Sequence, residues 1–525
     1  MQITFLKKSR YISFTKNPRI LNAFLLSLSS LFAFPVSAVG VDETINNAIA
    51  PLSTAISNFI FFEITVLGSA LPLIVLWLIG AAIFFTCYFN FISLKGFKHA
   101  FQLLRGDFSQ PNTKGELTHF QALSTAVSGT VGIGNIAGVA IVISVGGPGA
   151  TFWLIVAGFL GMSTKFAECV AGVMYRKINP DGSISGGPMY YLEAGLKERN
   201  LGWLGKPMGY FYAASIVIGC LGIGNMFQSN QAFQQFIFMT GGDTSFFADK
   251  GWLFGSLLAL IVGLVIIGGI KSIARVTSKL VPFMTLAYVI GALLVIGLNA
   301  EKIPWALSAI LSEAFKPSAM TGGMLGVMIL GFQRAAFSNE AGIGSAAIAH
   351  ATVKTSEPVT EGYVALLEPF IDTVVICTLT ALVILTTVYE PGLAGSGIQG
   401  IALTSEAFGS TIGWSVLPLS LIAILFAFST MLSWSYYGLK GWTYLLGESK
   451  GVEMVFKVFF CLFVALGCMI SLDAVLEFSD ALVFVIALPN ILGLYILAPV
   501  IKKELMSYQA RLSNGSIVNL RQQHD

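Results

Sequence analysis

The chain has 525 residues, of which 55% are hydrophobic and only 11% are charged. Soluble domains carry about 25% charged residues, so this composition excludes a water-soluble fold and predicts a polytopic membrane protein. The formal net charge of +3 says little by itself. We expect the lipid bilayer as a partner and no nucleic acid, and the positions of the charges inform on topology.

The first 38 residues have the pattern of a secretory signal peptide. Lysines and arginines cluster within residues 7–19, residues 20–34 form a short apolar core, and Val36-Ser37-Ala38 fits the small-residue cleavage motif. A retained short membrane helix is the alternative, and in both cases the chain continues on the outer side. We therefore expect a signal-like segment at 1–38. Residues 39–120 should hold an outer N-terminal segment, an extra transmembrane helix and a cytoplasmic loop.

Eleven apolar segments after this region are long enough to span a bilayer. They lie at about 62–94, 121–146, 149–175, 208–238, 252–270, 280–299, 320–349, 362–388, 413–439, 454–472 and 477–501. Because the chain enters from outside, the odd number predicts a cytoplasmic C-terminus. Lysine and arginine are concentrated in the expected cytoplasmic loops, whereas the expected outer loops hold only Lys250, Lys302 and Lys316. This asymmetry supports the predicted count of spans.

Two of these segments are interrupted by the same tripeptide. Gly132-Ile133-Gly134 divides the segment at 121–146, and Gly342-Ile343-Gly344 divides the segment at 320–349. Glycine weakens a helix interior by about 1 kcal/mol relative to alanine, so each tripeptide predicts a broken helix. A matched pair of glycine-broken membrane segments is typical of the binding site of a secondary transporter.

The positions of the two broken segments predict an internal repeat. Counted from residue 121, they are the first and the sixth of ten spans. Each is thus the first span of one half, as expected for a five-plus-five inverted repeat. The predicted repeats cover 121–319 and 320–506, and a polar cytoplasmic tail follows at 507–525.

Polar residues at membrane depth accompany both breaks, namely Thr130, Asn135, Ser338, Asn339 and Glu340. Such residues are tolerated there only when they are buried in protein or line a wet cavity. We therefore favour a binding site over close helix packing, which would explain the glycines alone. The glycine spacing also fits a dinucleotide fingerprint, but a spanning helix is the wrong context for that motif.

A third Gly-Ile-Gly-Asn occurs at 222–225. Gly222, Asn225 and Gln228 have helical spacing and are expected to share a face that lines a cavity. For Gln228 alone, a ligand contact and an interhelical hydrogen bond remain equally open.

Charged residues inside predicted spans usually mark function, because each costs at least about 2.5 kcal/mol by insertion scales. Lys165 and Glu168 lie three residues apart and are expected to form a structural pair. Arg334, Glu340, Glu368 and Asp372 stay open between ion pairing, gating and a direct functional role.

A candidate sodium site combines the segment at 413–439 with the first break. Phe426, Ser429 and Thr430 are spaced i, i+3 and i+4 and so share one helical face. One carbonyl and two hydroxyls from this face, with unwound carbonyls at Gly129 and Gly132, would supply five neutral oxygens, which suit sodium. There are two alternatives to this sodium site. The hydroxyls could donate to carbonyls of their own helix, or the coupling ion could be a proton carried by Glu340.

Several long motifs in one order resemble the alanine or glycine:cation symporter family, from about Phe120 to the end of the last span. They lie at 128–138, 146–153, 164–168, 185–191, 337–345, 370–373 and 434–438. The chain departs from the family pattern at Leu439, where a glutamate is usual.

The resemblance implies an all-α membrane protein with a leucine-transporter-type five-plus-five inverted repeat and one extra N-terminal span. It implies substrate contacts at Gly134, Asn135, Gln228, Phe337 and Trp434, and hydroxyl ligands for sodium at Ser429 and Thr430. Thr130, Gly132 and Ser338 complete the candidate substrate site. Backbone amides at the first break would bind a carboxylate, and the two aromatic rings would wall a small pocket.

We therefore expect a secondary active transporter that imports alanine or glycine with sodium across a bacterial inner membrane. We expect no enzymatic activity and no cofactor apart from the coupling ion. The alternative is a proton-coupled symporter of another small solute on the same fold. A channel would predict an open pore, and an intramembrane enzyme would need motifs that are missing here, whose four histidines form no cluster in the sequence. The choice among alanine, glycine and serine, the enantiomer, the stoichiometry and the oligomeric state remain open.

Overall fold

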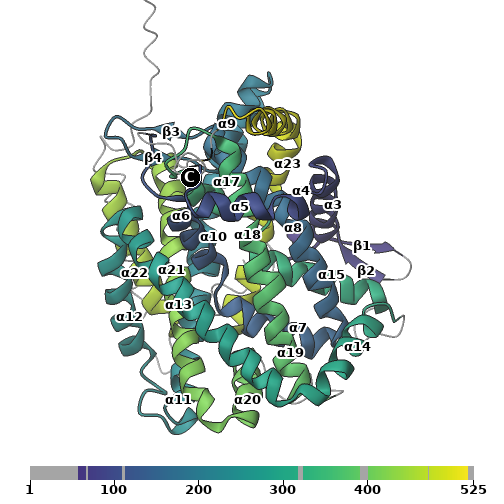
Figure 1. The fold of residues 1–525 in the computed structure, drawn as a ribbon. Helices are drawn as coiled ribbons and strands as arrows, with labels where there is room; N and C mark the ends of the chain where they lie inside the picture. The colour runs from purple at the N-terminus through teal and green to yellow at the C-terminus, as the bar shows by residue number, and fades with distance from the viewer. Residues whose placement is uncertain are drawn as a thin grey trace, which may run out of the picture.

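The computed structural model describes residues 57–66, 69–108, 113–316, 323–390, 400–470, 472–517 and 519. Helices dominate this part of the chain, as Figure 1 shows. The described strands form two short antiparallel pairs, β1 (Glu63–Val66) with β2 (Ser69–Pro72) and β3 (Lys177–Ile178) with β4 (Ile184–Ser185). The all-α architecture is thus confirmed, whereas the predicted signal-like segment at 1–38 lies outside the described residues.

The first predicted span is shorter than expected. Residues 63–72 form the β1–β2 hairpin, and the helix that follows, α3 (Leu73–Tyr88), has 16 residues. At a rise of about 1.5 Å per residue it is about 24 Å long, less than the hydrocarbon core of about 30 Å. Pro72 stands at the helix boundary, where its fixed φ suits the start of a helix. The prediction of one helix over 62–94 is therefore wrong.

The first predicted repeat contains one bent helix pair and several long helices. Its elements are α6 (His119–Thr130), η2 (Ile133–Asn135), α7 (Ala137–Gly146), α8 (Gly149–Met174), α9 (Pro188–Glu198), α10 (Gly202–Leu221), η3 (Gly222–Met226), α11 (Phe227–Met239), α12 (Gly251–Ile266), α13 (Gly269–Leu298) and α14 (Ile303–Glu313). The axes of α6 and of the run from Ile133 to Gly146 meet at 60°, so the first predicted break is present.

The second predicted repeat also begins with a broken helix. Its elements are α15 (Gly323–Asn339), α16 (Ser345–His350), α17 (Pro358–Ala365), α18 (Leu367–Pro369), η6 (Phe370–Cys377), α19 (Thr378–Thr386), α20 (Ile401–Thr411), α21 (Val416–Leu446), α22 (Lys450–Gly467) and α23 (Leu472–Ser513). The helix α23 continues past 506 to Ser513, so the first residues of the predicted tail are helical, and a cytoplasmic tail from 507 stays a prediction. Tyr508 is fully buried and Arg511 pairs with Glu357, which anchors this last part of α23.

Six described helices are long and apolar enough to cross a membrane, and the bent pair of α6 and α7 would make a seventh. The remaining predicted spans appear as shorter or more polar helices, among them α3 and α12 with 16 residues each and α15 with 17. The short helices α9, α14 and α20 lie outside the eleven predicted spans. The structure confirms a protein with several membrane-spanning helices, and the count of eleven stays a prediction.

The two breaks lie inside the molecule, where most of their residues are buried. The long helix α21 packs against α6, α10, α11 and α13, while α8 packs against α15, α16 and α17. In Figure 1, α12 and α22 cover one flank, and α3, α14 and α15 lie on the opposite flank. The short helices α5 (Phe97–Leu104) and α9 lie near one end, with α11, α14 and α20 near the other. This arrangement leaves both breaks enclosed by protein.

Candidate functional site

The first break is closed by its own asparagine. The helix α6 ends at Thr130, Gly132 is extended with φ −131° and ψ −161°, and η2 follows as a turn of 3-10 helix. The Gly132 N–H donates to Asn135 Oδ1 at 3.0 Å. Asn135 is fully buried. The asparagine side chain therefore satisfies a backbone donor that the broken helix leaves without a helical partner.

The same asparagine joins the two broken helices. Its Nδ2 donates to Asp372 Oδ1 at 2.5 Å and to Ser338 Oγ at 3.0 Å. The hydroxyls of Ser338 and Thr373 both donate to Asp372 Oδ2 at 2.7 Å. Two predicted substrate residues, Asn135 and Ser338, thus meet on one buried carboxylate. The polar atoms of Asn135 and Ser338 are therefore bonded to the protein itself. Asp372, whose role the sequence left open, is their common partner.

Two candidate residues converge on a third, Gly132. A Cβ atom added to this glycine would lie 2.7 Å from Thr430 Oγ1 and 3.3 Å from Gln228 Oε1. Gln228 Nε2 donates to the Ile223 carbonyl at 3.2 Å, whereas Oε1 has no hydrogen-bond partner among the described residues. Gln228 is only 3% exposed, and buried polar atoms normally have partners. The unpartnered oxygen beside an unwound backbone is therefore available to a ligand.

Two aromatic side chains flank this region. Gly134 faces Phe337, because a Cβ at Gly134 would lie 3.4 Å from that ring. Trp434 covers Gly224 so closely that a Cβ there would lie 2.0 Å from its Cγ. By contrast, the Thr130 hydroxyl bonds back to the Val127 carbonyl at 3.3 Å, within its own helix.

The expected shared face of Gly222, Asn225 and Gln228 is not present. Residues 222–226 form a π-helix, whose wider turn changes the register of the side chains that follow. Asn225 Nδ2 donates to the Phe460 carbonyl of α22 at 2.8 Å, while Gln228 lies at Gly132. The prediction of one amide face lining a cavity is therefore wrong for Asn225.

The candidate sodium ligands lie at the contact between α6 and α21. Ser429 Oγ and Thr430 Oγ1 both donate to the Phe426 carbonyl, at 2.9 Å and 3.1 Å. The two helices are joined by Ser128, whose hydroxyl donates to the Ser429 carbonyl at 2.7 Å. Gly129 lies near the end of α6, where carbonyls lack helical partners, and it faces Tyr437 in a later turn of α21. Two hydroxyl oxygens thus lie within hydrogen-bond distance of one carbonyl oxygen, beside the first break.

The second break follows a different backbone path. Glu340, Gly342 and Gly344 have φ angles of 56°, 96° and 85°, so the chain is left-handed at alternate residues. The Gly342 N–H donates to Glu168 Oε1 at 2.8 Å, and Asn490 Nδ2 donates to the Gly342 carbonyl at the same distance. The Trp434 indole N–H donates to Glu340 at 2.9 Å. Side chains from α8, α21 and α23 therefore hold this break.

These contacts change the expected ion pairs. Lys165 pairs with Glu368 at 3.0 Å and not with Glu168, whose Oε1 accepts from the Gly342 N–H of the second break. Arg334 pairs with Asp480 at 2.9 Å. Asn490 was not singled out from the sequence, since an isolated amide in an apolar segment gives no signal of its partner.

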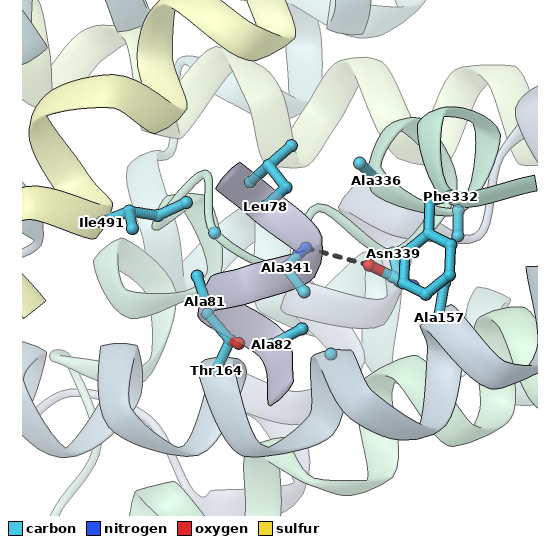
Figure 2. Close-up of a pocket in the computed structure, with 13 residues that line it drawn as sticks. Leu78, Ala81, Ala82, Ala157, Thr164, Phe332, Ala336, Asn339, Ala341 and Ile491 are labelled. Atoms are coloured by element: carbon cyan, nitrogen blue, oxygen red, sulfur yellow. Dashed lines mark hydrogen bonds between the residues drawn. The ribbon is translucent and has the colours of Figure 1, made fainter. Parts of the chain in front are cut away.

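A small cavity of about 30 Å³ lies behind the second break, between α3, α8, α15 and α23 (Figure 2). Its wall includes Asn339, whose Oδ1 accepts from the Ala341 N–H at 3.0 Å. Thr164 also lines it, with a buried hydroxyl that has no partner among the described residues. This volume suffices for one or two water molecules.

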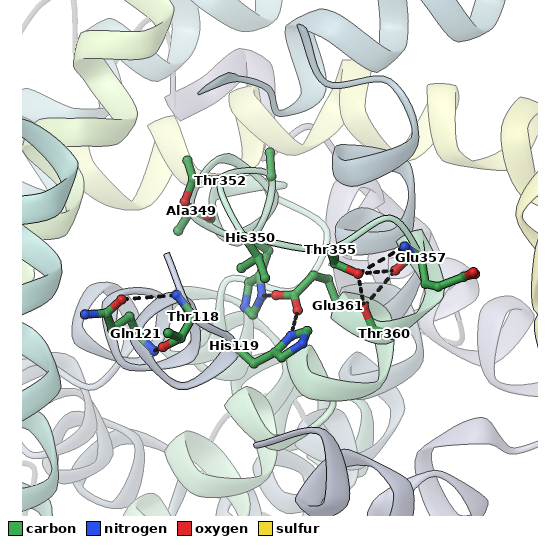
Figure 3. A network of polar contacts seen from close by, with 12 residues as sticks. Thr118, His119, Gln121, Ala349, His350, Thr352, Thr355, Glu357, Thr360 and Glu361 are labelled. Atoms are coloured by element: carbon green, nitrogen blue, oxygen red, sulfur yellow. Dashed lines mark hydrogen bonds and ion pairs between the residues drawn. The ribbon is translucent and has the colours of Figure 1, made fainter. Parts of the chain in front are cut away.

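A second polar network joins the ends of the two broken helices (Figure 3). Glu361 of α17 accepts from His119 Nδ1 at the start of α6 and from His350 Nδ1 at the end of α16, the latter at 2.5 Å. All three side chains are buried. Two of the four histidines therefore share one carboxylate, because the fold brings residues 119 and 350 to Glu361.

Arg176 reinforces this end of the molecule. Its guanidinium donates to the carbonyls of Ala351, Val353, Lys114 and Thr355, at 2.6 to 3.1 Å. The segments before α6 and after α16 are thereby held side by side.

Comparison with known proteins agrees with this architecture. The sequence profile described as the sodium:alanine symporter family matches residues 54–522. The sodium/alanine symporter AgcS of Methanococcus maripaludis is 38% identical over 440 residues, which is 83% of this chain and 94% of that protein. The probable sodium/glutamine symporter GlnT of Bacillus subtilis is 31% identical over 445 residues, 84% of this chain and 89% of that protein.

Among solved structures, MhsT in complex with L-phenylalanine matches with a TM-score of 0.51 and 16% identity, over 75% of this chain and 99% of that one. At this identity the likeness concerns the fold alone, and it confirms the predicted leucine-transporter-type fold. The family profile spans most of the sequence, and the match to AgcS covers more than two thirds of both proteins. The chain therefore belongs to the sodium:alanine symporter family.

Proposed function

We propose that the protein is a secondary active transporter that imports a small neutral amino acid, alanine or glycine, together with sodium. Membership of a family of cation-coupled amino-acid symporters supports the reaction class. The observation that carries the proposal is the convergence of Gln228 Oε1 and Thr430 Oγ1 on the unwound Gly132. An amino-acid ligand and a cation would there share one break, so that binding of each can depend on the other.

The substrate site would use the neutral groups of the first break. Backbone N–H groups near Gly132 and Gly134 can bind the carboxylate, helped by the N-terminal end of α7. The free Oε1 of Gln228 can accept from the ammonium group. Phe337 and Trp434 would limit the space for the side chain, which suits alanine or glycine.

A variant at Gly134 tests the substrate site. Gly134→Val should abolish alanine binding, because a branched Cβ both restricts the backbone and fills the space that faces Phe337. Alanine binding to the purified protein would be measured together with its thermal unfolding. Unchanged affinity in a folded variant would remove the first break from the site.

The sodium site would use the contact between α6 and α21. The Phe426 carbonyl and the hydroxyls of Ser429 and Thr430 would be completed by the carbonyls of Gly129 and Gly132. The hydroxyls would turn from the Phe426 carbonyl to place their oxygens on the ion. None of these five groups titrates, which favours sodium over a proton as the coupling ion.

Uptake of radiolabelled alanine into proteoliposomes tests the coupling. A sodium gradient should drive uptake, and Thr430→Ala should raise the sodium concentration for half-maximal uptake while leaving the folded protein unchanged. Ser435→Ala is the matched control, since this hydroxyl lies on the same helix and bonds locally to the Leu432 carbonyl. Uptake that does not depend on sodium and is driven by a proton gradient would support the proton-coupled alternative instead.

We also propose an inner-membrane location with a cytoplasmic C-terminus. Lys197 lies in the last turn of α9, and Arg176 directly precedes β3. Figure 1 shows α9 and β3 near the same end of the molecule, and the positive-inside rule favours such basic segments on a cytoplasmic face. Reporter fusions to the C-terminus should behave as cytoplasmic, and a periplasmic signal would overturn this orientation.

A further inference from the structure

Glu340 has an unusual backbone conformation for a residue with a side chain. It directly follows α15, and its φ of 56° lies in the left-handed region. Residues other than glycine seldom occupy this region, and they stay there only when the surrounding structure holds them. The nearby left-handed positions of the second break are glycines, Gly342 and Gly344. A glutamate at this point therefore requires a reason beyond the path of the backbone.

Both carboxylate oxygens of Glu340 have partners. Oε1 accepts the indole N–H of Trp434 at 2.9 Å, and Oε2 accepts the hydroxyl of Ser345 at the start of α16. Glu340 is only 2% exposed. The indole N–H is a donor only, so Oε1 must act as the acceptor. The side chain thus links α21 to the second broken helix across the break itself.

Trp434 has contacts on several sides. Its ring covers Gly224, where no Cβ would fit, and the Tyr437 ring stands at 5.7 Å. Its N–H edge is held by Glu340. Trp434 also lies one helical turn after Thr430, which contacts the first break at Gly132. The position of the indole next to the candidate amino-acid site therefore depends on a carboxylate from the opposite break.

We propose that Glu340 is a specificity-determining positioning residue, whose carboxylate fixes Trp434 as a wall of the amino-acid site and so limits the size of the transported side chain. This inference rests on the proposed function for amino-acid transport, and it deepens that function by assigning a role to a residue outside the proposed ligand set. Glu340 acts through Trp434 and does not itself contact the substrate.

The test compares the preference for alanine over leucine in uptake by reconstituted protein. Trp434→Phe removes the indole N–H and keeps an aromatic ring. Glu340→Gly removes the carboxylate that holds Trp434, and glycine adopts the left-handed backbone without strain. Any change in this variant therefore reports on the position of Trp434 and not on a distorted break. Each variant should reduce the preference by about 10-fold, the scale on which pocket contacts discriminate small apolar groups. The double variant should lose no more than either single variant, since both remove one contact.

Two further variants make the test specific. Glu340→Gln keeps a carbonyl oxygen that can accept from Trp434, so it should retain most of the preference and the drive by a sodium gradient. Trp442→Phe is the matched control, because this indole lies on the same helix and donates to the Val452 carbonyl at 3.1 Å, away from both breaks. Its preference for alanine should equal that of the unmodified protein.

Several results would overturn the inference. In one, Glu340→Gly retains the preference while Trp434→Phe loses it. In another, Glu340→Gln abolishes gradient-driven uptake and its pH dependence, which would make Glu340 a proton carrier. Because the readout is a ratio between two amino acids, it does not depend on the coupling ion. Absence of sodium dependence in the unmodified protein would instead overturn the proposed coupling and leave this inference standing.

Discussion

The two breaks share the tripeptide Gly-Ile-Gly but have different backbones. In the first break Gly132 is extended and residues 133–135 form a turn of 3-10 helix. In the second break the chain is left-handed at Glu340, Gly342 and Gly344. The tripeptide therefore predicts where a helix ends, because glycine permits many conformations, but it does not select the conformation.

The partners of the two breaks explain the difference. The first break is closed by its own Asn135 and presents Gly132 to two neutral side chains of neighbouring helices. The second is clamped by the carboxylate of Glu168 and the amide of Asn490, which come from helices outside it. The first break is therefore the one that we propose binds the ligand, whereas the second is held in place by the neighbouring helices.

The largest expected effect follows removal of the clamp on the second break. Glu168→Ala would leave the Gly342 N–H and one of the two Asn490 amide N–H groups without an acceptor, at a cost of about 1–3 kcal/mol for each. The other Asn490 N–H still donates to the Gly342 carbonyl. The free energy of unfolding should fall by about 3 kcal/mol, seen as a lower midpoint of thermal unfolding in detergent. Glu168→Gln, which keeps one carbonyl oxygen, should lose less. An unchanged midpoint in the alanine variant would contradict the clamp.

A pair of glycine substitutions compares the two backbones directly. Gly344→Ala should destabilise the protein by about 2 kcal/mol, since a left-handed alanine costs about 1–2 kcal/mol. Its Cβ would also lie 2.4 Å from Pro188 Cγ. Gly134→Ala should change stability by less than about 0.5 kcal/mol, because its Cβ would make an ordinary contact with Phe337. Equal unfolding midpoints for the two variants would show that the breaks do not differ as described.

The last expected effect is at Gly132 and concerns sodium affinity. The extended backbone there suits alanine, but the new Cβ would lie 2.7 Å from Thr430 Oγ1, a proposed sodium ligand. Gly132→Ala should therefore raise the sodium concentration for half-maximal uptake about 10-fold, since small displacements of binding groups are costly. Sodium titration of alanine uptake measures this change, and an unchanged titration would exclude Gly132 from the ion site.

Sequence alone determined the class of the protein and the places where its helices break. Long apolar runs require membrane-spanning helices, because backbone polar groups must be satisfied inside the bilayer. Gly-Ile-Gly within two of these runs marked both breaks, and the ordered motifs identified the family. These signals are local, since they depend on residues close together in the chain.

The tertiary structure decided which side chains meet. Lys165 and Glu168 are near in sequence, yet Lys165 pairs with Glu368, which is 203 residues away. The meeting of His119 with Glu361 and the wider turn at 222–226 also lacked a sequence signal. Periodicity encodes which face of a helix a residue occupies, whereas the partner opposite that face is set by how distant helices pack and by which buried donors need an acceptor.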